Sequence, residues 1–213
     1  MKKRVFSTKT GLFILCTAGS IIYLSLIFNN NLWVDEAFSA CIIRGSFKQM
    51  LEGTILDTLP PFYNVFTWLL TFILGYSSVV MKFSSVIPML LILLWLAPFH
   101  VARLYNDKTA AIFSICIFCA PHLLHYGVEI RPYSWGLFFT TAAGIYALEI
   151  LSDHAIKNYV LFAVFTALSG YTHQYSLIPC AFLWLALIIY SLRISESRRQ
   201  AVIFRRYGES ILS

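Results

Sequence analysis

The chain has 213 residues, of which 59% are hydrophobic and only 12% are charged, whereas a soluble domain carries about 25% charged residues. The apolar residues lie in continuous runs, so the composition excludes an ordinary soluble protein and predicts an all-α, polytopic membrane protein. The net charge of +6 does not predict a nucleic-acid partner, because the basic residues lie between the apolar runs, where they report membrane topology.

The first apolar run covers residues 11–28 and is long enough to cross a bilayer. It follows a basic stretch that includes Lys2, Lys3 and Arg4, and it lacks a small-residue cleavage site. We therefore predict a signal anchor that stays in the protein rather than a cleaved signal peptide. The basic stretch places the N-terminus in the cytoplasm.

Six further apolar runs follow, and the topology depends on whether all of them cross. They cover residues 60–76, 79–102, 110–126, 133–151, 159–171 and 177–192. If the run at 60–76 crossed, most later basic residues would lie outside, against the positive-inside rule. If it instead lies on the outer face, only four of the 16 basic residues lie outside. They are Arg44, Lys48, Lys82 and Arg131.

The sequence therefore predicts a transmembrane domain over residues 1–195, with about six crossings and both termini in the cytoplasm. The first outer loop, about residues 29–78, is expected to carry interfacial helices, and residues 196–213 form a basic cytoplasmic tail. The cytoplasmic loops are short and carry no recognisable motif, whereas polar residues gather in the outer loops. The outer face is therefore the predicted site.

Two acidic patches lie in the predicted first outer loop. In "WVDEAF", Asp35 and Glu36 form a carboxylate pair, although Asp35 can instead be read as the N-cap of an amphipathic helix that runs to about Leu51. In "LDTLPPFY", Asp57 precedes two prolines and Tyr63, and a turn before a helix start is the structural alternative.

Two further patches lie at the outer ends of later runs. In "HLLHYGVEIRPYS", His122, His125 and Glu129 share one helix face through their spacing, and Arg131 follows. Ionisable groups at membrane depth are costly to bury and usually functional, although an ion pair between Glu129 and Arg131 that anchors a helix end is the structural alternative. In "GYTHQYS", His173 lies among aromatic residues, where an interfacial anchor is the structural alternative.

Taken together, these patches predict a reaction rather than a set of anchors. A carboxylate can take a proton and a cation can stabilise a leaving anion, so the residues fit group transfer from a phosphate-linked donor. A lipid tail on that donor would lie in the bilayer beside the site.

Five stretches of the sequence follow one another in a familiar order: "WVDEAFSA", "DTLPPFYNVFTWLLTFILG", "MKFSSVIPMLL", "YGVEIRPYSW" and "GYTHQYS". In that order, over about residues 10–195, the chain resembles the N-terminal half of the polytopic GT-C glycosyltransferases that use polyprenyl-phosphate sugars. The resemblance implies a GT-C-type helical bundle in the cell (plasma or inner) membrane, which moves a sugar from a polyprenyl-phosphate donor to an acceptor hydroxyl on the extracytoplasmic face. Family members are usually much longer, which implies a missing C-terminal half or a partner subunit.

The resemblance also implies roles for individual residues. Asp35 matches the catalytic base in the family's first outer loop, and Glu36 lies beside it. Contacts to the donor phosphate or the substrate are implied for Asp57, Tyr63, Lys82, Glu129, Arg131 and His173. No cofactor is implied with certainty, and a divalent metal ion held by Glu129 is an open alternative.

The chain departs from the family's motifs at several positions. Leu59 stands where the family has His or Lys, and Gly127 and Val128 stand where Ser and Gln are usual. Two other functions therefore stay open. One is a transporter of lipid-linked sugars, which would also need intramembrane charges, although the two halves show no internal repeat. The other is a truncated, non-catalytic remnant or partner subunit.

Overall fold

The computed structural model describes residues 8–29 and 31–193, and it is built from helices with no strand in those residues. The predicted all-α class is therefore confirmed. The predicted basic stretch at Lys2, Lys3 and Arg4 and the predicted tail at 196–213 lie outside the described residues.

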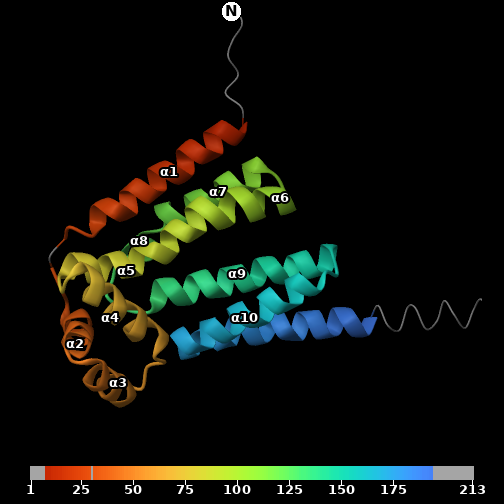
Figure 1. Cartoon of the computed structure of the whole chain (residues 1–213). Coiled ribbons are helices and arrows are strands. Elements are labelled where there is room, and N and C mark those ends of the chain that lie inside the picture. The colour runs from red at the N-terminus through yellow and green to blue at the C-terminus, as the bar shows by residue number, and fades with distance from the viewer. Residues whose placement is uncertain (1–7, 30, 194–213) are drawn as a thin grey trace, which may run out of the picture.

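Four helical stretches are long and apolar enough to cross a membrane, as a helical membrane protein requires. They are Thr8–Leu26 (α1), Ser78–Leu104, Tyr133–Ser152 (α9) and Gln174–Arg193. The second stretch joins α5 (Ser78–Leu91), the π-helix η1 (Ile92–Val101) and α6 (Ala102–Leu104), and the last begins with the 3-10 turn η2 (Gln174–Ser176). Figure 1 shows these stretches lying along one bundle, with the N-terminal end of α1 and the far end of the last helix on the same side.

Two shorter helices lie alongside the four long ones (Figure 1). α7 (Asp107–Cys119) contacts α1, and α10 (Ile156–Thr172) contacts α9. α7 is 13 residues long and is followed by α8 (Pro121–Tyr126), while α10 is 17 residues long. Both fall short of the roughly 20 residues that cross a bilayer as a straight helix, so the expected total of six crossings stays a prediction.

Three short helices gather at the end of the bundle opposite the N-terminus (Figure 1). They are α2 (Val34–Arg44), α3 (Phe47–Leu56) and α4 (Phe62–Leu74). α4 forms the run that was expected to lie on the outer face, and its 13 residues are too few to span a bilayer. It ends at Gly75, whose φ of 93° is a conformation that glycine adopts without strain.

The structural alternative for Asp35, the N-cap of one helix that runs to about Leu51, is wrong, because this stretch forms two helices. Trp33, not Asp35, occupies the N-cap of α2, and Asp35 lies in the first turn. The chain turns at Gly45, and Ser46 then caps α3: its hydroxyl accepts the N–H of Gln49, and Oε1 of Gln49 accepts the N–H of Ser46 at 2.9 Å. This reciprocal capping box starts a new helix where hydrophobic spacing alone would continue the first.

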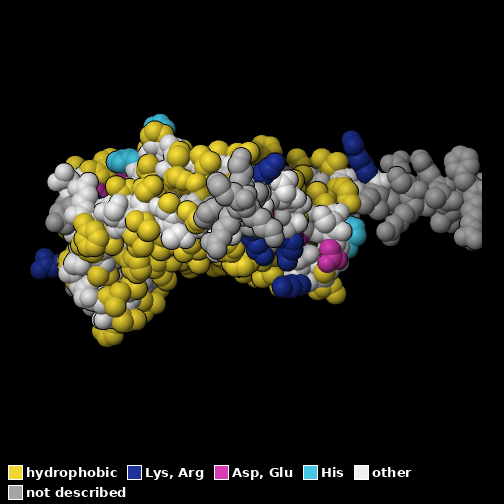
Figure 2. Space-filling view, turned by 90° about the horizontal axis from the view of Figure 1, so that it is seen from above, with side chains coloured by type: hydrophobic (Ala, Val, Ile, Leu, Met, Phe, Trp, Pro, Cys, Tyr) yellow, Lys and Arg dark blue, Asp and Glu magenta, His cyan; other side chains and the backbone are white. Residues whose placement is uncertain are grey.

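The surface of the bundle is apolar between its two ends. On the face that Figure 2 presents, apolar side chains cover much of the surface, and most Lys and Arg side chains lie toward the end where the last helix ends. The described basic residues at the helix ends and turns on that side are Lys9, Arg103, Lys108, Lys157 and Arg193. An apolar middle with polar ends is the distribution that a bilayer favours.

α1 and α7 approach each other closely at Gly19. A Cβ atom at this position would lie 2.5 Å from Cδ1 and 2.9 Å from Cγ of Phe118. Hydrogen bonds flank the contact: the Tyr23 hydroxyl donates to the carbonyl of Ile117 at 2.8 Å. Because lipid tails are as apolar as the helices, small residues and interhelical hydrogen bonds carry much of the association between membrane helices.

Replacing Gly19 by alanine is expected to force α1 away from α7 and to destabilise the protein by about 1–3 kcal/mol, the usual cost of overpacking a core. Gly11 lies on the same helix with no heavy atom within 4 Å of its Cβ position, so Gly11→Ala serves as the control. That control should be neutral or slightly stabilising, since alanine favours a helix. Thermal unfolding in detergent micelles measures both variants, and equal midpoints would contradict the close contact.

Candidate functional site

The candidate site lies at the α2–α3 end of the bundle, where the Glu36 side chain joins two distant segments. Glu36 is only 4% exposed. Its Oε2 accepts the N–H of Trp33 at 3.2 Å, and its Oε1 accepts the N–H of Ile130 at 3.0 Å. The carboxylate therefore fastens the first turn of α2 to the loop that follows α8. This contact supports a structural function for Glu36, and its expected catalytic role stays a prediction.

Arg131 makes a second connection from the same loop. Its Nη1 donates to Oγ of Ser39 on α2 at 3.2 Å and lies 3.6 Å from Oδ2 of Asp57, at the C-cap of α3. Burial raises the pKa of Asp57, Arg131 opposes that rise, and nearby Asp35 adds to it. The two motifs that hold Asp57 and Arg131 are therefore brought together, as an outer site requires.

Glu129 is a buried acid whose hydrogen-bonding capacity is unused. It is 4% exposed, and its Oε1 lies 2.7 Å from Nε2 of His125. The two groups are close enough for an ion pair, but their geometry does not make a hydrogen bond. Neither oxygen of Glu129 accepts a well-aligned hydrogen bond in the described part of the chain. A buried acceptor without a donor is costly, so its presence favours a ligand that donates a hydrogen bond there.

Carboxylates crowd around Glu129 and change its acidity. Burial raises its pKa above the ordinary 4.5, and nearby Glu36 and Asp35 raise it further. Nearby His125 and Arg131 oppose this rise without cancelling it. The first outer loop and the loop after α8 therefore share one electrostatic environment, in which Asp35 is half-buried.

A cavity of about 410 Å³ opens beside these groups. Its polar wall contains Glu36, Glu129, His125 and Lys82, and its apolar wall includes Ile22, Leu26 and Leu124 from α1 and α8. Charged groups on one wall and aliphatic groups on the other suit a ligand with a polar head and an apolar chain.

Lys82 supplies the positive charge inside the cavity. The side chain belongs to α5, and the residue is 4% exposed. Its Nζ donates to the carbonyl oxygens of Asn29 at 2.5 Å and Asn31 at 3.1 Å. Since an ammonium has three donors, one N–H is left for a ligand.

Five of the expected site residues do not line this cavity: Asp35, Asp57, Tyr63, Arg131 and His173. Tyr63 is 1% exposed, and its hydroxyl lies 3.0 Å from Oγ of Ser85 in the contact between α4 and α5. His173 lies between Tyr133 and Tyr175, with ring centroids 5.5 Å away on each side. Burial, with a contribution from Arg131, lowers the pKa of His173 below its ordinary 6.5, so its imidazole is mainly neutral at neutral pH.

The opposite end of the bundle holds a charged cluster that the sequence analysis did not identify. Glu149 of α9 is buried there and pairs with His100 and Arg103. These three residues belong to helices, so the expectation about the cytoplasmic loops stays a prediction. The available signal was Glu149 itself, a carboxylate within a long apolar run.

Neither a metal site nor a similarity to known proteins identifies the reaction at this site. Among residues 8–29 and 31–193, no group of three or more His, Cys, Asp or Glu side chains could hold a metal ion. No protein-family model, no curated protein and no solved structure matches the chain. The functional roles of the site residues are therefore proposals from their own geometry.

Replacing Glu36 by alanine is expected to lower the stability of the protein, because the buried N–H of Ile130 would lose its partner at a cost of about 1–3 kcal/mol and the part-buried N–H of Trp33 would lose its own. Glu52→Ala is the control, since Glu52 is an exposed acid whose ion pair with Lys48 spans 3.8 Å. Thermal unfolding compares the two, and hydrogen exchange at the Ile130 amide locates the effect. Unchanged exchange at Ile130 would contradict the assigned contact.

The raised pKa of Glu129 predicts a stability that depends on pH. The folded protein holds the proton of this carboxyl more tightly than the unfolded chain does, so the resulting stabilisation is full below pH 4.5 and is lost as pH rises through the folded pKa. Glu129→Gln should remove this dependence, so that the variant gains stability relative to the unmodified protein as pH rises. Unfolding midpoints across this pH range, with Glu52→Gln as control, measure the difference. A difference that is constant with pH would contradict the raised pKa.

Proposed function

We propose that this chain is a membrane glycosyltransferase, or the N-terminal module of one, that moves a sugar from a polyprenyl-phosphate donor to an acceptor hydroxyl. The observation that carries the proposal is the cavity beside α1 and α8, in which the Lys82 ammonium and the Glu129 carboxylate face an aliphatic wall. A lipid-linked phosphate needs a cation for its head and apolar surface for its chain, and this cavity offers both.

The donor is proposed to bind with its phosphate at Lys82 and its polyprenyl chain along the aliphatic wall. The third N–H of Lys82 donates to a phosphate oxygen, while the other two stay on the carbonyls of Asn29 and Asn31. Ile22 and Leu26 continue the wall along α1, a helix long enough to cross the bilayer. The chain of the donor would therefore leave the cavity toward lipid.

The transfer step is proposed to use Asp35 as the base. Asp35 takes the proton of the acceptor hydroxyl as the acceptor oxygen bonds to the anomeric carbon, on the face opposite the phosphate. The bond from the anomeric carbon to the phosphate oxygen breaks, and the polyprenyl phosphate leaves with the electron pair, stabilised by Lys82. Glu129 accepts a hydrogen bond from the acceptor, which supplies the partner that its buried oxygens lack. Arg131 holds Asp57 and α2 in place around the reacting groups.

The proposed topology places the site on the extracytoplasmic face of the cell membrane. In it, α7 with α8 and α10 cross together with the four long helices, as expected for a GT-C-type bundle. The gathering of Lys and Arg side chains at the opposite end supports this orientation (Figure 2). The four helices that are long and apolar enough to cross a membrane support an orientation in which lipid surrounds the middle of the bundle.

A transporter of lipid-linked sugars is the second candidate. It is favoured by the Glu129 carboxyl, whose raised pKa and burial suit a group that takes up and releases a proton during transport. The two candidates differ in the fate of the donor: an enzyme breaks the bond between sugar and phosphate, whereas a transporter delivers the donor intact.

Membranes that contain the full chain are expected to release sugar from one of a panel of radiolabelled polyprenyl-phosphate sugars. Replacing Asp35 by asparagine should reduce this turnover by about 10²–10⁴-fold, the usual contribution of a positioned general base. Glu52→Gln changes an exposed acid on α3 and should leave turnover unchanged. Turnover that is undiminished in Asp35→Asn would remove Asp35 as the base, and movement of intact donor without breakdown would establish the transporter instead.

A further inference from the structure

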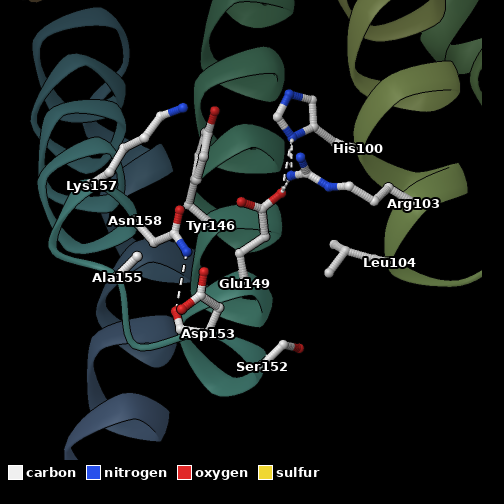
Figure 3. Close-up of a pocket in the computed structure, with 10 residues that line it drawn as sticks. All are labelled: His100, Arg103, Leu104, Tyr146, Glu149, Ser152, Asp153, Ala155, Lys157 and Asn158. Carbon is white, nitrogen blue, oxygen red and sulfur yellow. Dashed lines mark hydrogen bonds and ion pairs between the residues drawn. The ribbon is translucent and has the colours of Figure 1, made fainter.

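A second pocket, of about 560 Å³, lies at the end of the bundle opposite the site described above. It is bounded by residues of η1 and α6, the end of α9 and the start of α10 (Figure 3). Figure 3 shows Arg103 and Lys157 approaching from opposite sides, with Glu149 and Tyr146 between them. The pocket therefore brings charged groups from three helical segments together.

The Glu149 carboxylate forms the closed part of this pocket. Its side chain is 9% exposed, Oε1 lies 3.0 Å from Nδ1 of His100, and it forms an ion pair with Nη2 of Arg103. His100 lies in the π-helix η1 and Arg103 in α6, which directly follows it, and π-helical stretches alter which side chains face a neighbouring helix. Arg103 compensates the charge of Glu149, and because its side chain is 62% exposed, its other N–H groups stay accessible.

Among the described residues that line the pocket, one cation and one anion have no partner once Glu149 and Arg103 are paired. Lys157 and Asp153 both line the pocket. In the described residues, neither the Lys157 ammonium nor the Asp153 carboxylate has a recorded ion pair or hydrogen bond. The backbone carbonyl of Asp153 accepts Nδ2 of Asn158 at 3.1 Å, which orders the turn between α9 and α10. A ligand with one negative and one positive group would complement these two side chains.

The start of α10 adds a preference for phosphate on the side of Lys157. Ala155 occupies the N-cap and offers no side-chain oxygen to the first N–H groups of this 17-residue helix. Unsatisfied N–H groups and the positive end of the helix dipole favour an anion there. The negative group of the ligand is therefore placed at Lys157 and the positive group at Asp153.

Exposed apolar side chains surround the pocket and indicate a lipid. Ile156, which lies between the pocket residues Ala155 and Lys157, is 81% exposed, and Leu151 and Tyr159 nearby are 39% and 45% exposed. Aliphatic and tyrosine side chains beside a charged pocket at a helix end are typical of the boundary between lipid headgroups and acyl chains. Acyl chains of a bound lipid would cover this surface.

We infer that this pocket binds the phosphoethanolamine headgroup of a membrane lipid, with the phosphate at Lys157 and the primary ammonium at Asp153. A purely anionic headgroup would leave Asp153 uncompensated. A choline headgroup has no N–H to donate to a carboxylate, and its methyl groups keep its positive nitrogen further from the Asp153 carboxylate. The inference does not depend on the proposed transfer reaction, because it uses a separate set of residues at the other end of the bundle.

Native mass spectrometry of the full chain tests the inference. The protein is released from micelles that contain equal amounts of phosphatidylethanolamine, phosphatidylcholine and phosphatidylglycerol with identical acyl chains. Phosphatidylethanolamine should be retained about tenfold more than either other lipid, and Lys157→Gln should lower its retention about tenfold, as expected for loss of one charge-assisted contact. Asp153→Asn should remove the preference over phosphatidylglycerol.

Lys108→Gln is the matched control, because Lys108 is an exposed lysine at the same end of the bundle and does not line this pocket. Equal effects of Lys108→Gln and Lys157→Gln would overturn the inference, as would equal retention of the three lipids. A preference for phosphatidylethanolamine over phosphatidylglycerol that survives in Asp153→Asn would overturn the pairing of the ammonium with Asp153. Glycerophosphoethanolamine is added in a last arm, and displacement of the lipid by this soluble compound at equal concentration would overturn the lipid as the source of the group.

Discussion

The hydrogen bonds of the Glu36 carboxylate are the constraint on which the candidate site depends. Glu36 and Ile130 are 94 residues apart, yet one oxygen of Glu36 accepts the Ile130 N–H while the other caps α2. Buried N–H groups need a partner, so this contact holds the loop after α8 in one position against α2. Glu129 and Arg131 flank Ile130 in the sequence, and the contact therefore places both. It directs the Glu129 carboxylate to the cavity and the Arg131 guanidinium to Ser39 and Asp57.

The buried carboxylates at the two ends of the bundle differ in the partners that surround them, and this difference bears on function. At the N-terminal end, Glu149 has close partners in His100 and Arg103, so its charge is compensated within the protein. At the other end, neither oxygen of Glu129 has an aligned donor among the described residues, and burial, with a contribution from nearby carboxylates, raises its pKa. Compensation is typical of a site that holds its shape, whereas an unsatisfied acid costs stability that a ligand can recover. The end with the unsatisfied acid is therefore the one to which we assign the chemistry.

Hydrophobic runs predicted the long helices well, and they failed where a few polar atoms decide the backbone. The runs near residues 11–28, 133–151 and 177–192 correspond closely to helices of the structure. The break between α2 and α3 was missed because the Ser46–Gln49 capping box outweighs the continuing apolar spacing. The pocket around Glu149 was missed for another reason. Its residues come from η1, α6, α9 and α10, and the π-helix alters the register that an α-helical spacing would assign to His100 and Arg103.

The sequence by itself determined the class of the protein, because long uncharged runs can only be satisfied as helices in lipid, where every backbone group needs a partner within its own segment. It also identified the polar motifs, since charged residues stand out against such a background. Only the tertiary structure decided which of them meet. Glu36 became a partner of two backbone N–H groups, Tyr63 a buried contact between helices, and Glu129 a cavity acid with no aligned hydrogen bond in the described residues. Hydrogen bonds between residues far apart in the chain require that their atoms be placed to within a few tenths of an ångström. The packing of the helices sets these positions, and the local sequence does not specify them.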